Sequence, residues 1–214
     1  GTTDYFVGAL KGDILTAFPE ANIIDINHSV PAHDLVRGAF IFKNAWHHFP
    51  KGTVHICAVS GSSELPPPLI ALFFHGHYFI GVDNGFFSLA LNASLDESYF
   101  ILDSRGSKVA PHSAVLASSA VFLAKGGKLA EMGEKMTGLV EKSMIQPVTE
   151  ESTIRGTVIY TDSHGNLVTN IEKSLFERIA RGREFDIILK TREYIISDIN
   201  TDYYDVAGGN LLAL

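Results

Sequence analysis

The chain has 214 residues, enough for one large domain or for a domain of ordinary size together with a smaller one. Apolar residues make up 46% of the chain and charged residues 19%, which is globular usage and excludes the disordered and fibrous classes. The net charge of −7 argues against a nucleic acid as partner, because phosphate binding needs a surplus of Lys and Arg.

Cys57 is the single cysteine of the chain, so the sequence excludes an intrachain disulfide and a cysteine-based metal cluster. No apolar stretch approaches the roughly 20 residues of a membrane span, and no signal peptide is visible. We therefore expect a cytoplasmic protein without a membrane partner. Because the chain opens on Gly1 and stops at Leu214, directly after an apolar run, we expect both ends to be truncated.

Helical and extended patterns alternate in the first part of the chain. Residues 4–18 carry apolar side chains at close to helical spacing, and Pro19 ends this pattern. An extended run over residues 22–26 is followed by a helical pattern over residues 33–49 and an apolar strand over residues 53–59. This alternation predicts an α/β domain with a largely parallel sheet that is flanked by helices.

The next segments continue this domain. Residues 69–74 and 77–82 have the pattern of a β-hairpin, with His and Gly in the turn between them. We further expect a short helix over residues 86–91, a strand over residues 99–102 and a helix of small residues over residues 113–124.

The sequence predicts three regions along the chain. Residues 1–138 form the N-terminal α/β domain, and the weak apolar pattern of residues 139–153 suggests a linker. Residues 154–214 contain short, closely spaced strands around one helix, which suits a small C-terminal β-barrel-like domain. Its expected strands are residues 157–160, 167–171, 185–189 and 194–196, and its expected helix is residues 175–181.

Polar clusters interrupt the apolar elements at four loops, and α/β folds place ligands at such loops. The clusters are residues 2–5, 30–34, 82–85 and 161–166. Each also has a purely structural interpretation. These are a helix N-cap for the first, a polar helix start for His33 in the second, an Asn-Gly turn for the third and a hairpin loop for the fourth.

Several common chemistries find no support in the sequence. The histidines lack zinc-type spacing, since His47 and His48 point in different directions on a helix and His75 and His77 flank a turn. No Gly-x-Ser-x-Gly elbow occurs, and the Gly-Ser-Ser run of residues 61–63 lacks the lysine of a phosphate loop. We therefore expect no metal and no hydrolase triad.

Five segments carry a resemblance to a known family. They are GTTDYFVGALKG from Gly1, IIDINHSVPAHDLVRGA from Ile23, FPKGTVHICAV from Phe49, HYFIGVDNGFFSL from His77 and GTVIYTDSHGNLVTNI from Gly156. In this order they resemble the S-adenosylmethionine hydrolases, also called S-adenosylmethionine hydroxide adenosyltransferases, which are related to fluorinases and chlorinases. The resemblance implies an N-terminal α/β domain, a C-terminal barrel-like domain, and a homotrimer with its sites between neighbouring subunits.

The resemblance also implies roles for individual residues. Asp4 and Asp162 match positions that hold the ammonium group of the methionine moiety, as two carboxylates can do through charge-assisted hydrogen bonds. Asn166 matches an amide that contacts the nucleoside, and His33 matches a position that lines the ribose pocket. The other positions that it places near the substrate are Asp83 and Asn84.

The chain departs from the family where water is activated. The family carries Asp-Pro-Gly-Val-Gly followed by Arg, and later a His. Here Ser60 stands at the Asp position, the Arg is replaced within residues 66–68, and His112 fits the His position only after a slip of one residue. Ser60 and Ser63 can hold a water molecule but are not bases at neutral pH, so His112 or Glu64 is left to supply the base.

The resemblance thus implies hydrolysis of S-adenosylmethionine to adenosine and L-methionine by in-line attack of water at the ribose 5′ carbon. No cofactor is expected, because the sulfonium already makes methionine a good leaving group. The alternative is a non-catalytic protein that binds S-adenosylmethionine or adenosine after loss of the catalytic Asp, Arg and His. The family also has a strand before the position of Gly1 and a segment after that of Leu214.

Overall fold

The computed structural model describes residues 4–59, 67–91, 97–101, 112–189 and 194–214. The chain divides into two compact units, Gly1–Met144 and Ile145–Leu214. The division falls inside residues 139–153, the segment that the sequence suggests as a linker. None of the described helices is long and apolar enough to cross a membrane.

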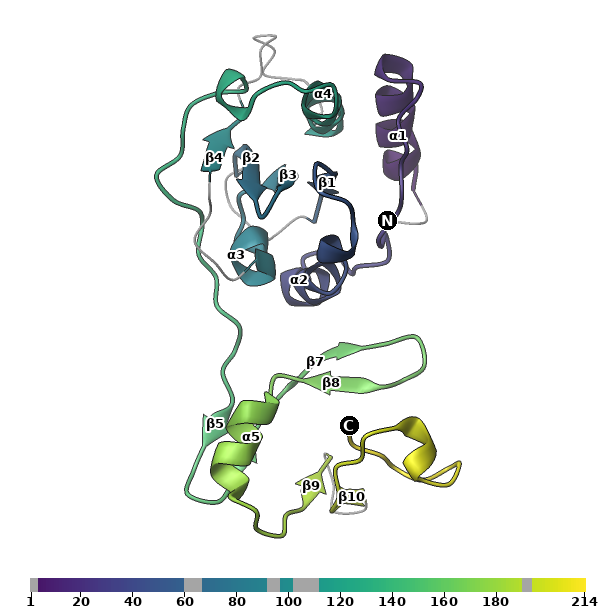
Figure 1. The fold of residues 1–214 in the computed structure, drawn as a ribbon, viewed down its shortest axis with the longest axis vertical. Coiled ribbons are helices and arrows are strands. Elements are labelled where there is room, and N and C mark those ends of the chain that lie inside the picture. Colours follow the sequence, from purple (N-terminus) through teal and green to yellow (C-terminus); the bar gives the residue numbers. More distant parts are fainter. Residues whose placement is uncertain (1–3, 60–66, 92–96, 102–111, 190–193) are drawn as a thin grey trace. The chain divides into compact units, whose positions relative to one another are not determined.

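A four-stranded sheet forms the centre of the first unit (Figure 1). Its strands, in the spatial order β1-β3-β2-β4, are β1 Val54–Cys57, β3 His77–Val82, β2 Leu69–Phe74 and β4 Glu97–Phe100. Only β1 and β3 pair in parallel, whereas β2 is antiparallel to both β3 and β4. This corrects the expected largely parallel sheet.

The reason for this correction is the hairpin, which the sequence predicted and the structure confirms. Its two-residue turn, His75 with φ 50° and Gly76 with φ 86°, reverses the chain without room for a crossover. The residues 22–26 that we expected to form a strand form none. Within this run, Asp25 bonds to Lys11 of the first helix and Ile23 packs in a cluster with Ile14 of that helix, so strand propensity yields to tertiary context here.

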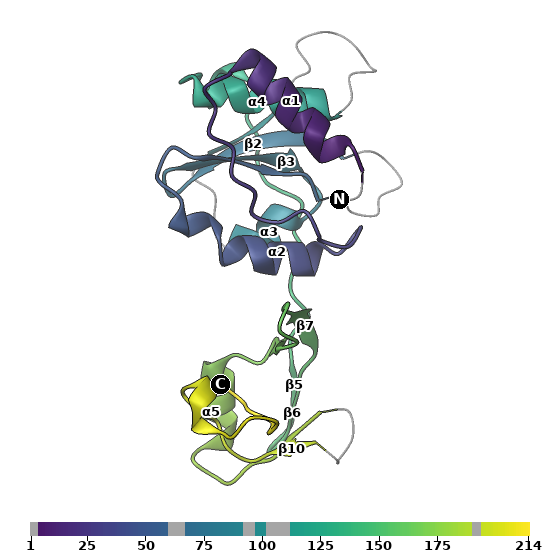
Figure 2. The same cartoon turned by 90° about the vertical axis from the view of Figure 1, so that its right-hand side faces the viewer.

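Helices cover both faces of this sheet (Figure 2). The pair α1 Phe6–Ala17 and α4 His112–Ala124 packs on one face, and α2 Leu35–Lys43 and α3 Phe86–Leu91 pack on the other. Two short 3₁₀ helices, η1 Trp46–His48 and η2 Leu129–Glu131, complete the described elements of the first unit. These positions confirm the helices that the sequence predicted here, except that the expected helix over residues 33–49 is divided into α2 and η1.

The core of the first unit lies on both sides of β2. Ile70 and Leu72 pack towards α2 and α3, whereas their neighbour Ala71 packs towards α4, and all three are completely buried. This alternation with a period of two is expected for a strand that is buried on both faces. The sheet therefore provides a rigid base for the loops at its edge.

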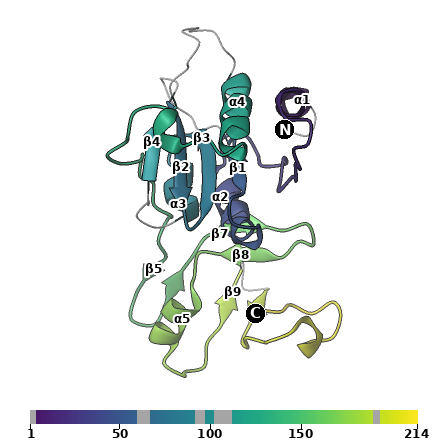
Figure 3. The same ribbon diagram turned by 45° about the horizontal axis from the view of Figure 1, so that its top comes forward.

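The second unit consists of short elements. Its antiparallel pairs are β5 Val148–Thr149 with β6 Ile154–Arg155, β7 Val158–Thr161 with β8 Leu167–Thr169, and β9 Ile187–Ile188 with β10 Ile195–Ile196. Figure 3 shows the β7–β8 hairpin. The helices are α5 Lys173–Ala180, which confirms the expected one, and the 3₁₀ helix η3 Tyr203–Asp205.

The strand pairs of this unit form separate two-stranded sheets, so the described residues contain no closed barrel and the expected barrel is not confirmed. Strands of two to four residues give too few ladder bonds to join into one sheet. None of the described residues in this unit is fully buried, whereas the core residues of the first unit reach zero exposure.

Candidate functional site

The loop between β7 and β8 is organised by the carboxylate of Asp162. Its Oδ1 accepts hydrogen bonds from the backbone N–H groups of His164 at 2.8 Å and Asn166 at 2.9 Å. Its Oδ2 accepts a third from Asn166 Nδ2 at 2.8 Å. Gly165, with φ 89°, provides the positive φ that closes this turn. The structure therefore brings together the predicted ligands Asp162 and Asn166.

The hydrogen bonds around Asp162 also determine its charge. The bond from the Asn166 side chain is the largest of several that lower the pKa of Asp162, so this carboxylate is anionic at neutral pH. Among the residues that the structure describes, no Lys or Arg forms an ion pair with it. The loop is thus both a hairpin connection, as its structural interpretation predicted, and a site with negative charge available to a cation.

Tyr203 lies beside this loop, and the sequence did not single it out. Its hydroxyl is 3.4 Å from Asn166 Nδ2, and the side chain is 60% exposed. It begins η3, where Asp202 and Asp205 form a reciprocal capping box. The Asp-x-x-Asp spacing of residues 202–205 is a sequence signal for this turn, but it does not indicate that Tyr203 contacts Asn166.

Asp4 stands just before α1. Its Oδ1 accepts a hydrogen bond from the N–H of Phe6, the first residue of this helix, at 3.1 Å, and the side chain is exposed. This bond satisfies a free N–H at the helix start, but the N-cap residue of α1 is Tyr5, so the expected N-cap role of Asp4 is not confirmed. The binding role of Asp4 stays a prediction.

His33 immediately precedes the cap of α2. It is exposed and has φ 67°, a left-handed conformation that is uncommon outside glycine. The following residue, Asp34, caps α2 by accepting a hydrogen bond from Arg37 N–H at 3.0 Å. Residues in this strained region are frequent at functional sites, but a polar helix start explains the position equally well.

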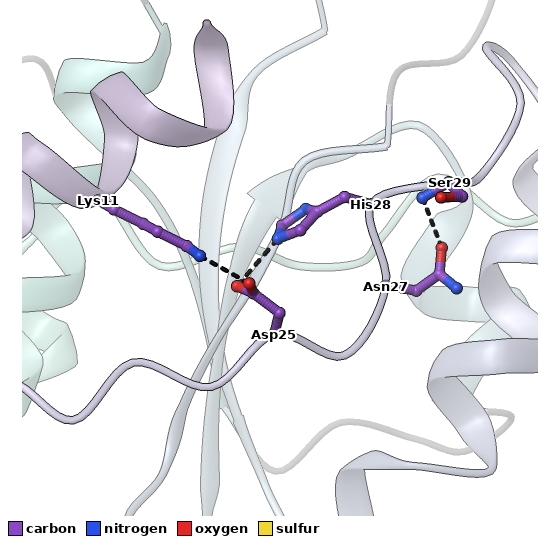
Figure 4. A network of polar contacts seen from close by, with 5 residues as sticks. All are labelled: Lys11, Asp25, Asn27, His28 and Ser29. Carbon is purple, nitrogen blue, oxygen red and sulfur yellow. Dashed lines mark hydrogen bonds and ion pairs between the residues drawn. The ribbon is translucent and has the colours of Figure 1, made fainter. Parts of the chain in front are cut away.

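A polar network holds the segment that leads to His33 (Figure 4). Asp25 Oδ2 is 2.6 Å from Lys11 Nζ on α1, and Asp25 Oδ1 is 2.9 Å from His28 Nε2. The bond from Lys11, followed by that from His28, lowers the pKa of Asp25. The sequence carries no signal of this network, because Lys11 on α1 and Asp25 on the following segment are 14 residues apart.

Asp83 and Asn84 are buried, each with 7% exposure, in the turn between β3 and α3. Asn84 Nδ2 donates to the carbonyl oxygen of Val59 at 2.8 Å, and Asp83 Oδ1 accepts from Val140 N–H at 3.0 Å. Burial raises the pKa of Asp83, although the bond from Val140 opposes this shift. Both side chains are therefore occupied by contacts with the protein itself.

The structure describes only a small part of the predicted catalytic residues. Ser60 and Ser63 lie outside the described residues, as does Glu64. His112 begins α4, but its side chain lies outside what the structure describes. Among the described residues, no group of three or more His, Cys, Asp or Glu side chains is arranged to hold a metal ion.

Comparisons with known proteins relate the chain to one family over most of its length. Residues 1–133 match the N-terminal domain of S-adenosylmethionine hydroxide adenosyltransferases, and residues 156–214 match the C-terminal domain. A solved structure, an uncharacterized conserved protein from Thermotoga maritima, superposes with a TM-score of 0.83 at 24% identity and covers 99% of this chain and 84% of its own. This last likeness concerns the fold.

Three named relatives are similar in sequence over a smaller share of this chain. The (R)-S-adenosyl-L-methionine hydrolase of Methanocaldococcus jannaschii is 28% identical over 81% of this chain, which spans 64% of that relative. The enzyme of the same name from Salinispora arenicola is 29% identical over 85% of this chain and 72% of its own length. A fluorinase from an Actinoplanes species is 24% identical over 88% of this chain and 74% of its own length. The chain belongs to the S-adenosylmethionine hydroxide adenosyltransferase family.

Proposed function

We propose that the protein binds S-adenosylmethionine and hydrolyses it to adenosine and L-methionine. The observation that carries this proposal is the β7–β8 loop, where three N–H donors keep the Asp162 carboxylate anionic without a Lys or Arg partner among the described residues. Such a carboxylate suits the ammonium group of a methionine moiety. Membership of the family and the names of the relatives support the same ligand.

The proposed binding roles follow the sequence resemblance. Asp4 and Asp162 pair with the ammonium group, Asn166 contacts the nucleoside through its amide, and His33 lines the ribose pocket. Two of these roles agree with the local geometry, since Asp162 is anionic and Asn166 is held beside it by a 2.8 Å hydrogen bond. A ligand that binds here would find both groups already oriented, which lowers the entropic cost of binding.

The proposed reaction is an in-line displacement. A water oxygen forms a bond to the ribose 5′ carbon while the bond from this carbon to sulfur breaks, and the electron pair of that bond neutralises the sulfonium. The water loses a proton, so the products are adenosine, methionine and one proton. We propose that the hydroxyls of Ser60 and Ser63 hold this water and that His112 accepts the proton. The substrate supplies its own leaving group, so no cofactor takes part.

A non-catalytic binding protein is the second candidate, and a specific sequence observation favours it. Ser60 occupies the position of the family's Asp, and an ungapped alignment puts Pro111 on the family's His. A hydroxyl is a far weaker base than a carboxylate at neutral pH, so loss of these groups would slow proton removal. Ligand binding would be retained, because Asp162 and Asn166 stand outside that stretch of the sequence.

One experiment separates the two candidates. The full-length protein is incubated with S-adenosylmethionine in ¹⁸O-labelled water, and adenosine is quantified by chromatography and mass spectrometry. Hydrolysis at the 5′ carbon predicts ¹⁸O in the 5′ hydroxyl of adenosine, above the level without protein. Binding in calorimetry without adenosine formation would establish the second candidate, and the absence of both would reject the two together.

We also propose that the protein is a homotrimer whose subunits complete one another's sites. The supporting observation is the second unit, in which none of the described residues is fully buried and many large apolar side chains are exposed. Large apolar side chains that would gather on an exposed surface commonly mark an interface with another protein, and the homotrimer would bury them. Light scattering coupled to gel filtration should give three times the mass of one chain, and a monomeric mass would contradict the proposal.

A further inference from the structure

The amide nitrogen of Asn166 has a partner for each of its two hydrogens. Nδ2 lies 2.8 Å from Asp162 Oδ2 and 3.4 Å from the hydroxyl oxygen of Tyr203. A side-chain amide nitrogen donates two hydrogen bonds and accepts none, so each of these oxygens accepts one of them. The second bond is long and correspondingly weak. Asn166 therefore uses both of its side-chain donors within the protein.

The partners also decide which way the amide of Asn166 points. An ionised carboxylate only accepts hydrogen bonds, so the amide nitrogen, and not the amide oxygen, must face Asp162. The backbone supports this arrangement, since Asn166 N–H donates to Asp162 Oδ1 at 2.9 Å and Asp162 N–H donates to the carbonyl oxygen of Asn166 at 3.1 Å. Within the described part of this unit, no group donates a hydrogen bond to Asn166 Oδ1. This oxygen is thus the side-chain atom that Asn166 can offer to a ligand.

Tyr203 is held in place by its own turn, although its side chain is 60% exposed. It begins η3, where Asp202 and Asp205 form a reciprocal capping box. Asp205 Oδ2 also accepts a hydrogen bond from the N–H of Thr201 at 2.9 Å. These bonds close the turn around Tyr203, so its hydroxyl reaches Asn166 from an ordered backbone. Two elements of one unit, 37 residues apart in the sequence, therefore meet at a single amide.

We propose that Asn166 reads the nucleobase through its side-chain oxygen, that Tyr203 is the positioning residue which fixes this orientation together with Asp162, and that the site therefore selects a 6-amino purine over a 6-oxo purine. This inference rests on the proposed contact of Asn166 with the nucleoside. An amide oxygen is an acceptor and needs a donor on the ligand. Adenine presents its 6-amino donor beside N7, whereas a 6-oxo purine presents two acceptors along the same edge.

A 6-oxo purine would be rejected for two reasons. Its oxygen would face Asn166 Oδ1, and both oxygens would lose water without gaining a hydrogen bond. Turning the amide over does not relieve this contact, because Oδ1 would then face the carboxylate of Asp162. A site that hydrogen-bonds an N–H of its ligand also discriminates against an analogue without this group more strongly than an apolar pocket does.

Three nucleosides of nearly the same shape test the selection. Adenosine carries a 6-amino group, purine riboside a hydrogen and inosine a 6-oxo group at the same position of the base. Their affinities for the full-length protein are measured by calorimetry. We expect adenosine to bind about ten-fold tighter than purine riboside, which lacks only the donor, and about a hundred-fold tighter than inosine, which adds an acceptor.

The variant Tyr203→Phe removes the hydroxyl and keeps the ring. The amide of Asn166 then has one fixed partner instead of two, so its oxygen is less well oriented for a ligand. We expect the affinity for adenosine to fall by about three-fold to ten-fold, while the affinities for purine riboside and inosine stay the same. The matched control is Tyr204→Phe, the same change in a neighbouring side chain that is 94% exposed. It should leave all three affinities unchanged.

The pattern across the three nucleosides separates a positioning role from a merely structural one. If Tyr203→Phe weakens all three nucleosides equally, the hydroxyl maintains the structure in general and the positioning role is rejected. An unchanged affinity for adenosine in this variant rejects it as well. If inosine binds to the unaltered protein as tightly as adenosine, Asn166 does not read position 6 and the selection is rejected.

The same measurements distinguish this inference from the proposed function. Selective binding of adenosine without hydrolysis of S-adenosylmethionine would reject the proposed reaction and leave the inference established. Hydrolysis without selection between adenosine and inosine would reject the inference alone. If adenosine does not bind, the inference is wrong, and the binding of S-adenosylmethionine then decides the proposed function separately.

Discussion

His55 Nε2 on β1 lies 3.2 Å from His77 Nδ1 on β3, and both side chains are only 4% exposed. Aromatic rings surround the pair, with Phe42 and Phe49 edge-on to His55 and Phe79 stacked on it. Burial, followed by the charge of His77, lowers the pKa of His55 to about 4. Burial also lowers the pKa of His77. Two neutral imidazoles can share one hydrogen bond here, whereas two cations cannot.

This pair predicts a loss of stability in mild acid. Unfolding exposes His55 and returns its pKa to about 6.5, so the unfolded state takes up a proton that the folded state refuses. The stabilisation is complete above pH 6.5 and declines as the pH falls towards 4. Between pH 7.5 and 5.0 we expect His55 to account for a loss of about 2 kcal/mol in the free energy of unfolding, measured with urea.

A variant that cannot titrate checks this assignment. His55→Phe should reduce the dependence of stability on pH, whereas the same change at the exposed His48 should leave it unaltered. An unchanged pH dependence in His55→Phe would show that the acid sensitivity arises elsewhere.

The charge of Asp162 can be separated from the two hydrogen bonds that it accepts from the backbone. Asp162→Asn keeps an acceptor for the backbone N–H groups of His164 and Asn166 but removes the negative charge, together with the acceptor for Asn166 Nδ2. If Asp162 pairs with the substrate ammonium, affinity for S-adenosylmethionine should fall about ten-fold to a hundred-fold in calorimetry. Asp198→Asn, an exposed change in the same unit, is the control and should leave affinity unchanged. Equal affinity in both variants would remove Asp162 from the site.

The buried carboxyl of Asp83 predicts a stabilising substitution. Its pKa is raised by burial, so the folded state disfavours the ionised form and stability declines as the pH rises through the raised pKa. Asp83→Asn keeps the acceptor for Val140 N–H without the charge. Its melting temperature should exceed that of the unaltered protein at pH 7.5, and the difference should disappear near pH 4.

Removing the acceptor altogether should have the opposite effect. Asp83→Ala leaves the N–H of Val140 without its partner and is expected to cost about 1 to 2 kcal/mol in the free energy of unfolding. If Asp83→Asn and Asp83→Ala destabilise the protein equally at pH 7.5, the negative charge of Asp83, and not its hydrogen bond to Val140, contributes the stability.

The ion pair between Lys11 and Asp25 should contribute little to stability. Both side chains are partly exposed, at 34% and 44%, and water screens such pairs. Asp25→Asn should lower the free energy of unfolding by less than about 1 kcal/mol. This difference should shrink in about 0.5 M salt, because salt screens the ion pair. A loss several times larger, independent of salt, would assign the network a role beyond a surface ion pair.

The sequence by itself determined the elements whose bonds are local. Helical spacing predicted α1, α3, α4 and α5, and a two-residue His-Gly turn predicted the β2–β3 hairpin. The Asp162 loop belongs here too, because its partners are two and four residues away and follow from the spacing of Asp, Gly and Asn.

Only the tertiary structure decided which segments meet across the chain. The position of β2 between β3 and β4, the unpaired residues 22–26 and the separate sheets of the second unit depend on packing that no local pattern encodes. Asn84 was expected to be a turn residue or a ligand, and its hydrogen bond to the carbonyl of Val59, 25 residues earlier, is a contact that no local pattern predicts. Local hydrogen bonds follow from sequence spacing, whereas long-range partners are selected by which surfaces can be buried together.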